Sequence, residues 1–573
     1  MAPVLITLIC FVIYLAGYHL YARYLARHLF ELDATAKTPA HTMTDGIDYV
    51  PTRKGVLFGH HFASIAGLSP MLGPAIAVIW GWVPALIWIV FGTVFIGAVH
   101  DFSTLVVSIR RRGTSIGKVA EDIMGPRAKS LFHIIIFFLI SLAMGVFAYI
   151  VATLFSSPMP PAAPSNVQHP EAVVPTASLM ILAVIVGFLV YKKQARITPL
   201  TIIAFIIMLI VVVLGLGMPI LGVSRIRWTT VLLVYCFLAS VLPVWLLLQP
   251  RDYLNSLLLF LGLGLMYLGF FATRPSFAAP ALQLHPEGAP PLFPFVFITI
   301  ACGAVSGFHG LVSSGTTAKQ LNRETDAQFI GYGAMIGESL LGLIAVLACT
   351  CGFASMTEWS THYASWNAAE GLGPKMAAFI SGAGTFLGSV GIPRHWGEAF
   401  ISLIAISFAL TSMDSGTRLL RFNLNEVGDT LGISFLKNRY ISSALAAGAI
   451  GFFALLKVPM EVGGVMQYHP AGLALWALFG TTNQILGGLS LLAVTLYLWQ
   501  KRKPIVYTLI PMIFMLITTL IAMVQNLGGY IRDGKTTLVI IGGLIFFFAV
   551  WLAVEAVIRL VQYSRGKVPP LSF

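Results

Sequence analysis

The chain has 573 residues, of which 57% are hydrophobic and only 10% are charged, and its mean hydropathy is +0.87. These values exclude a water-soluble domain, because soluble chains carry about a quarter of charged residues. The formal net charge of +13 at pH 7 does not indicate nucleic-acid binding, since Lys and Arg lie between apolar runs and form no aromatic-rich basic domain. We therefore expect an all-α, polytopic helical membrane protein.

Apolar runs long enough to cross roughly 30 Å of hydrocarbon recur along the whole chain. About fifteen spans are predicted, at 3–25, 57–80, 82–109, 130–156, 176–191, 197–219, 229–248, 253–273, 293–317, 329–353, 395–420, 439–457, 471–500, 504–527 and 536–563. With the N-terminus outside, 27 of the 35 Lys and Arg residues fall in loops on the inner side, as the positive-inside rule requires. This orientation places the C-terminus in the cytoplasm, and it leaves a hidden pair of crossings or a re-entrant segment open.

The first unusual span is "LFGHHFASIAGLSPMLGPAIA" (57–77), which places adjacent histidines, prolines and glycines inside an apolar run. Pro70 and Pro74 each remove a backbone donor, so we expect an unwound turn between Ser64 and Gly73. Broken membrane helices commonly line binding sites, because freed carbonyls can hold a cation and a half-helix N-terminus can face a carboxylate. A Pro-kinked packing helix is the alternative.

A second candidate broken helix covers 293–320 and contains "GAVSGFHGLVSSGTTAKQ" (303–320). The spacing G-x-H-x5-G occurs in both segments, at Gly59, His61 and Gly67 and again at Gly307, His309 and Gly315. We treat an internal repeat as a hypothesis. The two segments and a polar pair in a later span supply the candidate substrate-binding residues: His60, His61, Ser64, Ser69, His309, Ser313, Ser314, Asn483 and Gln484.

Ionisable residues inside spans are costly in hydrocarbon and usually face a partner or a cavity. His100 and Asp101 lie about two helical turns before a cluster of arginines, so we assign them, together with Pro70 and Pro74, a structural role. For Asp101 a direct part in transport is equally open. Glu338 is flanked by glycines without a local cation, which makes it the candidate proton carrier.

Asp414 lies among hydroxyl side chains in "ALTSMDSGTRLL". Hydroxyl and carboxylate oxygens are ligands that hard cations prefer. A sodium site and a structural carboxylate paired with Arg418 are equally open. The candidate ion-coupling residues are therefore Glu338, Thr411, Ser412, Asp414 and Ser415.

Adjacent residues on a helix point about 100° apart, so one of His60 and His61 can face a pathway while the other bonds to a neighbouring helix. Both are also candidate metal or haem ligands. The five cysteines form no CxxC pair and are expected to be packing residues.

We expect one integral membrane domain over 1–573. The Pro-rich loop from Ser156 to Pro175 is predicted to be an extracytoplasmic connector. The stretch 354–394 is amphipathic and predicts a short interfacial helix with a re-entrant or surface loop. Residues 504–573 are predicted to form peripheral C-terminal helices.

The stretch from "YVPTRKGVLFGHHFASIAGLSPMLGPAIAVIWGWVPALIWIVFGTVFIGAVHDF" to "SIRRRGTSIG", within 49–125, resembles the carbon starvation protein A (CstA) family of bacterial inner-membrane transporters. "SGFHGLVSSGTTAKQL", "ALTSMDSGTRLLR" and "FGTTNQILGGLSLL" are also similar to that family. The resemblance implies uptake of peptides or pyruvate during nutrient limitation, driven by a cation gradient. It also implies a distant relation to the amino acid/polyamine/organocation superfamily, with its inverted repeat and two discontinuous helices.

Together these features predict a secondary transporter in the bacterial inner membrane and not an enzyme. Its expected partners are a small molecule or short peptide and the lipid bilayer, with no nucleic acid; proton and sodium coupling are both open, and no cofactor is required. The alternative is a membrane redox protein with haem or a metal on His60 or His61. An ATP-driven pump is disfavoured, because the chain contains no GxxxxGK[ST] motif.

Overall fold

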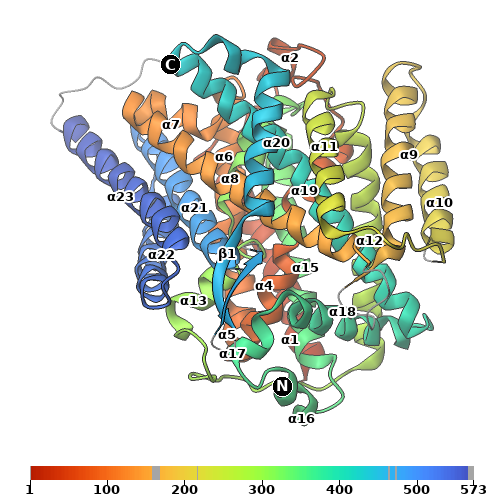
Figure 1. Ribbon diagram of the computed structural model, residues 1–573. Helices are drawn as coiled ribbons and strands as arrows, with labels where there is room; N and C mark the ends of the chain where they lie inside the picture. Colours follow the sequence, from red (N-terminus) through yellow and green to blue (C-terminus); the bar gives the residue numbers. More distant parts are fainter. Residues whose placement is uncertain (1, 158–167, 216, 463–464, 471–473, 565–573) are drawn as a thin grey trace.

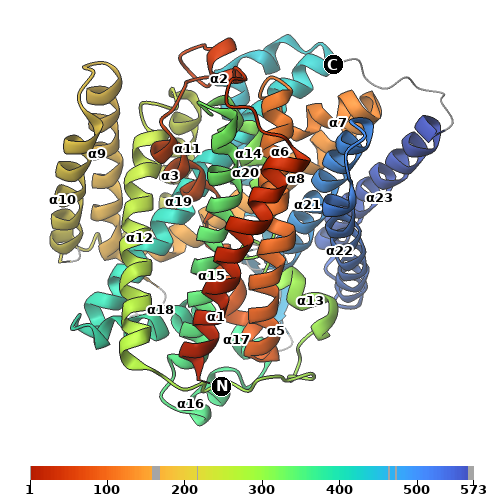
Figure 2. The same ribbon diagram turned by 180° about the vertical axis from the view of Figure 1, so that it is seen from behind.

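The computed structural model describes residues 2–157, 168–215, 217–462, 465–470 and 474–564. The long helices pack side by side and run between two opposite faces of the molecule (Figures 1 and 2). In the first half of the chain the α-helices are α1 (Pro3–Ala16), α2 (Pro39–Thr42), α3 (Lys54–Ile65), α4 (Ser69–Ala77), α5 (Trp82–Ile87), α6 (Ala98–Arg110), α7 (Ile116–Met124), α8 (Pro126–Phe155), α9 (Val173–Tyr191), α10 (Ile197–Gly215), α11 (Arg225–Val241) and α12 (Leu248–Thr273).

The second half of the chain is equally helical. Its α-helices are α13 (Leu292–Thr299), α14 (Gly307–Gly315), α15 (Gly333–Cys351), α16 (Met356–His362), α17 (Trp366–Glu370), α18 (Leu372–Ser389), α19 (Arg394–Leu431), α20 (Arg439–Leu455), α21 (Ala474–Gln500), α22 (Val506–Arg532) and α23 (Thr536–Ser564). The 3₁₀ and π-helical segments are η1 (Gly17–Ala22), η2 (Leu25–Leu29), η3 (Val78–Trp80), η4 (Trp88–Gly97), η5 (Pro170–Ala172), η6 (Thr317–Lys319), η7 (Glu324–Asp326), η8 (Gln328–Tyr332) and η9 (Ser434–Lys437). A short antiparallel hairpin, β1 (Lys457–Val462) with β2 (Val465–Pro470), was not expected; it pairs Lys457 with Pro470.

Ten helical stretches among the described residues are long and apolar enough to cross a membrane, or eleven if the bent pair α3 and α4 forms one span. The expected spans at 229–248 and 439–457 correspond to α11 and α20, each of 17 residues. The span at 293–317 corresponds to the separate helices α13 and α14, and the one at 471–500 to α21. Every expected span coincides with helical structure, but fewer than fifteen pass this test of length and composition.

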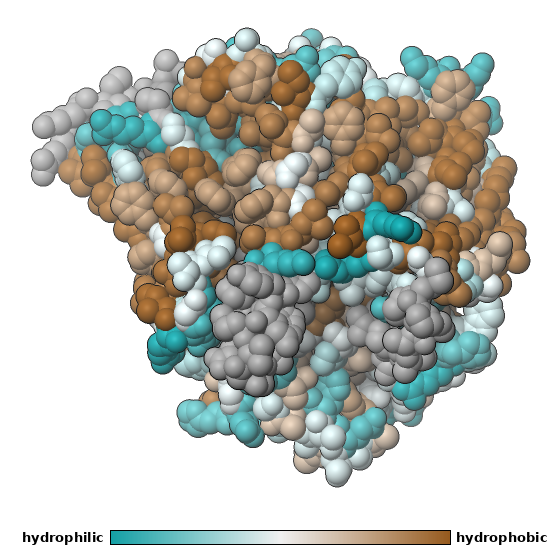
Figure 3. Space-filling model, viewed as in Figure 1, coloured by the Kyte–Doolittle hydropathy of each residue, from teal (hydrophilic) through white to brown (hydrophobic). Residues whose placement is uncertain are grey.

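Several helices at the edge of the bundle are apolar on their exposed sides. The span that contains α10 has a mean hydropathy of 3.0 although only 17% of it is buried, and the span of α23 has 2.6 with 28% buried. On the face seen in Figure 3, apolar side chains cover much of the upper and middle part, and hydrophilic ones gather towards the lower end. Exposed apolar helices of this kind are suited to contact with lipid.

The first predicted break is present but shorter than expected. Helix α3 ends at Ile65 and α4 begins at Ser69 with a bend of 45°, so the unwound turn is confined to 66–68. Pro70 lies in the first turn of α4, where its missing N–H would have had no helical partner, and Pro74 lies inside α4. Both prolines therefore belong to the second half of the broken helix, and neither lies in the unwound turn.

The second predicted break is longer and spans 300–306, between the end of α13 and the start of α14. The repeated G-x-H-x5-G spacing does not occupy equivalent positions: its histidine precedes the break in α3 and follows the break in α14. Helices α3 and α14 nevertheless pack against each other, so both histidine-containing halves lie together in the bundle.

Two glycines allow the backbone of the second broken helix to pack closely against its neighbours. A Cβ atom at Gly73 would lie 2.5 Å from the carbonyl oxygen of Thr299, and one at Gly97 would lie 2.0 Å from that of Ala304. Both oxygens belong to backbone at or beside the break, so any added side chain would displace it.

We expect Gly97→Ala to destabilise the protein by about 1–3 kcal/mol, the usual cost of overpacking. The matched control is Gly264→Ala in α12, where an added Cβ has no atom within 4 Å. Thermal unfolding of the detergent-purified variants measures the difference. Equal midpoints for Gly97→Ala and Gly264→Ala would show that the close approach is not needed.

The stretch 354–394 contains three helices, α16, α17 and α18. Helix α18 has 18 residues and packs against α12, α15 and α19, so this region is more closely integrated into the bundle than an interfacial loop would be. Helices α22 and α23 lie at one edge of the bundle (Figures 1 and 2), next to α21. The division of the chain into these regions stays a prediction.

Candidate functional site

A chain of four buried ionisable residues links the second broken helix to α6 and α15. His309 Nδ1 lies 3.0 Å from Asp101 Oδ2, and His100 Nδ1 lies 2.8 Å from the other oxygen of Asp101. On the other side of its ring, His309 Nε2 lies 3.2 Å from Glu338 Oε2. All four side chains are fully buried. We call His100, Asp101, His309 and Glu338 the histidine–carboxylate chain.

The hydrogen-bond pattern of the histidine–carboxylate chain leaves a place for one proton, between His309 and Glu338. An ionised Asp101 can only accept hydrogen bonds, so His309 donates its Nδ1 proton to it and presents Nε2 to Glu338. Neither oxygen of Glu338 forms a hydrogen bond with the described residues. A proton shared between His309 Nε2 and the Glu338 carboxyl group would form a hydrogen bond between them. Without that proton, the lone pair of Nε2 faces the buried carboxylate of Glu338, which is unfavourable.

Asn483 and Gln484, in α21, are bound to the second break itself. The Asn483 side-chain oxygen accepts hydrogen bonds from Ser306 Oγ at 3.1 Å and from the backbone N–H of Phe308 at 2.9 Å. The Gln484 amide donates to the carbonyl oxygens of Phe297 and Val305 at 3.1 and 3.0 Å. These amides satisfy backbone groups that the break leaves without helical partners. Their expected contact with the substrate stays a prediction.

A second buried group, the arginine–aspartate cluster, consists of Tyr235, Arg251, Asp252 and Asp414. Arg251 donates to Asp252 Oδ1 from Nε at 3.1 Å and from Nη2 at 2.6 Å. Its Nη1 donates to the hydroxyl of Tyr235 at 2.7 Å and forms an ion pair with Asp414. Tyr235 in turn donates to Asp414 Oδ2 at 2.5 Å. The cluster ties α11, α12 and α19 together.

The expected sodium cage around Asp414 is not present. Thr411 donates to carbonyl oxygens of its own helix, at Ser407 and Phe408. Ser412 donates to the carbonyl oxygen of Ser64 at 3.1 Å, and Ser415 shares a hydrogen bond of 2.8 Å with the Ser64 hydroxyl. The expected alternative is also corrected, because Asp414 pairs with Arg251, while Arg418 pairs with Asp48 at 2.6 Å.

The adjacent histidines of α3 have different partners, as their helical spacing predicts. His60 Nδ1 lies 2.6 Å from Asp252 Oδ2, and its Nε2 lies 3.3 Å from the amide nitrogen of Gln320. His61 Nδ1 lies 2.8 Å from Thr317 Oγ1, and its Nε2 forms no hydrogen bond with the described residues. With both ring nitrogens engaged, His60 has no nitrogen free for a metal or haem.

The described residues contain one group of donors close enough to hold a metal ion, and it excludes His60 and His61. Its ligand atoms, from Cys302, His309 and Glu338, all lie within 4.8 Å of one another. The Cys302 thiol donates to Ser306 Oγ at 3.4 Å. Binding of a metal here would require the thiol to lose its proton.

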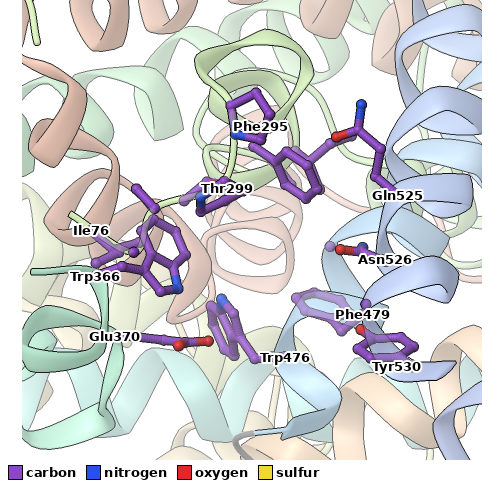
Figure 4. Close-up of a pocket in the computed structure, with 18 of the residues that line it drawn as sticks. Ile76, Phe295, Thr299, Trp366, Glu370, Trp476, Phe479, Gln525, Asn526 and Tyr530 are labelled. Atoms are coloured by element: carbon purple, nitrogen blue, oxygen red, sulfur yellow. The ribbon is translucent and has the colours of Figure 1, made fainter. Parts of the chain in front are cut away.

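A cavity of about 690 Å³, which we call the vestibule, approaches both breaks from one side of the bundle (Figure 4). Helices α13, α17, α18, α21 and α22 contribute to its wall, and it reaches Ser69, Thr299 and Ala301. Among the predicted substrate-binding residues, Ser69 lines the vestibule. The other predicted residues are buried and do not line it: His60, His61, Ser64, His309, Ser313, Ser314, Asn483 and Gln484.

Sequence reasoning did not single out Arg251 and Asp252 as site residues. The expected spans end at 248 and begin again at 253, which places both residues in a loop, but α12 begins at Leu248 and carries both charges into the bundle. Their burial follows from packing against α3 and α19, which a periodicity argument does not reveal.

We expect cysteines at Ser69 and Thr299 to be labelled by membrane-impermeant thiol reagents, because both positions line the vestibule. His61→Cys and Ser313→Cys are fully buried here and should react only when the opposite side opens. All five native cysteines are buried and can be replaced by Ser or Ala to remove background. If His61→Cys, Ser64→Cys, His309→Cys and Ser313→Cys stay unreactive in preparations open to either side, a shared pathway is excluded.

The structure defines a polytopic helical membrane protein in which two broken helices meet a buried polar chain and an open vestibule. The chain belongs to the carbon starvation protein CstA family, which matches residues 2–362 and 354–522. This confirms the family resemblance found in the sequence.

Two curated relatives are named as transporters. The chain is 34% identical to "Peptide transporter CstA" of Escherichia coli (strain K12), over 89% of this chain and 79% of the relative. It is 32% identical to "Pyruvate/proton symporter BtsT" of the same organism, over 88% of this chain and 79% of the relative. Among solved structures, a manganese transporter of Eremococcus coleocola aligns with a TM-score of 0.49 and 10% identity, over 91% of this chain and 99% of that one.

Proposed function

We propose that this chain is a proton-coupled secondary transporter that imports peptides or pyruvate across the bacterial inner membrane by alternating access. Its role would be uptake during carbon starvation. The names of the two relatives support the substrate class, and one of those names includes proton symport. The N-terminus lies outside and the C-terminus in the cytoplasm, an orientation supported by the distribution of Lys and Arg in the loops.

The histidine–carboxylate chain carries the proposal of proton coupling. Glu338 and His309 Nε2 face each other at 3.2 Å, and Asp101 holds the far side of the imidazole. A proton bound between the two facing groups neutralises the buried carboxylate, and its loss leaves an uncompensated charge. Because His309 belongs to α14, directly after the second break, binding and release of the proton act on the helix that lines the proposed pathway.

Sodium coupling at Asp414 is less favoured, since Arg251 already supplies the positive charge next to that carboxylate. A sodium ion there would have to displace the guanidinium or lie beside it. In our proposal the arginine–aspartate cluster is structural, with Asp414 as one of its members.

In the outward-open state the substrate enters the vestibule and reaches Ser69 and Thr299 at the two breaks. Movement of α3 and α14 would then bring His61, Ser64, His309 and Ser313 into contact with the pathway from the other side. The packing of α3 against α14 supports their movement together.

Purified protein in vesicles, with pH and sodium gradients imposed separately, tests the proposal. We expect an inward proton gradient to drive accumulation of pyruvate or a dipeptide, and a sodium gradient alone to drive none. Equal amounts of protein-free vesicles provide the leak control. Accumulation that follows the sodium gradient at constant pH would refute proton coupling.

A further inference from the structure

Lys375 is a buried lysine at the wall of the vestibule. Its side chain, in α18, is only 5% exposed, and it lines the cavity together with residues of α13, α21 and α22. No carboxylate among the described residues lies within 4.0 Å of its ammonium group. The Lys375 ammonium lies over the ring of Trp476, 5.7 Å from the ring centre. Glu370 lines the same cavity, and its charge acts on Lys375 from beyond 4.0 Å. A buried ammonium without a directly bonded anion is costly unless one joins it.

Two further hydrogen-bond donors with no partner among the described residues line the same cavity. The Tyr530 side chain is 8% exposed, and its hydroxyl forms no hydrogen bond with the described residues. The amide nitrogen of Asn526, one turn earlier in α22, is buried and also lacks a partner there. Figure 4 shows Asn526 and Tyr530 on one side of the cavity, Trp366 and Glu370 on the other, and Trp476 between them.

We propose that Lys375 binds the carboxylate of the substrate in the vestibule, before the substrate reaches the broken helices. Asn526 and Tyr530 donate hydrogen bonds to the other polar groups of the substrate. The inference rests on the proposed function, whose transported species it identifies as an organic carboxylate. Pyruvate and the C-terminus of a peptide share this chemistry. A charge-assisted bond from a buried ammonium is strong because the surrounding protein excludes competing water.

The position of Lys375 on the proposed outer face adds an independent argument. Only eight of the 35 Lys and Arg residues fall outside the inner loops, so a basic residue on this side departs from the general bias. Lys375 is one of these eight, and it is buried in the cavity wall. Lys535, another of the eight, follows the end of α22 and pairs with Asp533 at 2.8 Å.

Binding of radiolabelled pyruvate to detergent-purified protein, without any gradient, tests the subsite. Dialanine and dialanine amide compete against the label; the amide replaces the carboxylate by a neutral group. We expect Lys375→Gln to weaken binding of carboxylates about tenfold or more and to leave the weak binding of the amide unchanged. Lys375→Arg should retain most of the affinity, and Lys535→Gln, a matched loss of charge, should bind like the wild type.

Each result bears on the subsite separately from transport. If only unlabelled pyruvate displaces the label, the ligand is a small keto acid. If dialanine displaces it as well, the subsite also accepts a peptide carboxylate. Either result supports the role of Lys375 if Lys375→Gln weakens the binding. Unchanged affinity in Lys375→Gln, equal competition by dialanine and its amide, or no binding to the wild type would overturn the subsite. Thermal unfolding confirms that Lys375→Gln is folded. Because no gradient is present, a failure of proton coupling leaves this measurement unaffected.

Discussion

Glu338→Gln is expected to abolish accumulation against a gradient while leaving counterflow intact. Glutamine preserves the size of the side chain, but it cannot exchange a proton with His309 Nε2, which lies 3.2 Å from the native carboxyl group. Exchange of labelled for unlabelled substrate requires binding and reorientation but no net proton movement, so it should continue. The measurement is uptake by vesicles under an imposed pH gradient, compared with counterflow at equal pH.

A matched substitution at another carboxylate tests whether the effect on accumulation is specific to Glu338. Glu398→Gln removes a carboxylate whose side chain is 32% exposed and which pairs with the exposed Arg394, so it should transport normally. Accumulation by Glu338→Gln at the wild-type level, or equal loss of counterflow and accumulation, would contradict a role in coupling. In the second case the residue would be needed for binding or for folding.

Arg251→Ala is expected to destabilise the protein more than any other single substitution considered for these clusters. It would leave Asp252 and Asp414, both fully buried, without their cation. Removing one partner of a buried ion pair typically costs about 3–5 kcal/mol. Thermal unfolding in detergent, followed by size-exclusion chromatography of the remaining folded protein, measures the effect.

The control for Arg251→Ala is Arg394→Ala. Its guanidinium also bonds to a glutamate, but the side chain is 64% exposed, and surface ion pairs contribute little. We therefore expect a small change in its unfolding midpoint. A midpoint for Arg251→Ala as high as that of Arg394→Ala would show that the two aspartates do not depend on Arg251.

Much of the fold could be predicted from local sequence. A membrane span is predicted by an apolar run of sufficient length, and all expected spans coincide with helices. The two breaks were also predicted, because Gly and Pro inside an apolar run favour an interrupted helix whatever the tertiary structure around it. The bounds of the breaks were not predicted: Pro70 lies in the first turn of α4 and not in the unwound turn, since proline is well tolerated in the first turn of a helix.

The pairing of the buried charges could not be predicted in the same way. Sequence identified Glu338, Asp414 and the histidines as unusual, because an ionisable group in an apolar run is conspicuous. It did not identify their partners: Asp414 pairs with Arg251, 163 positions away by residue number, and Arg418, only four positions away, pairs with Asp48.

The sequence by itself determined that this protein is a helical membrane protein with two interrupted helices and with polar residues placed inside its spans. The tertiary structure alone decided that His309 joins Asp101 to Glu338, that Asn483 and Gln484 satisfy the second break, and that Lys375 lines the vestibule. The physical reason is that hydrophobicity and helix interruption act over a few neighbouring residues. Charge compensation in a membrane interior acts across helices, so it depends on which helices the whole fold brings together.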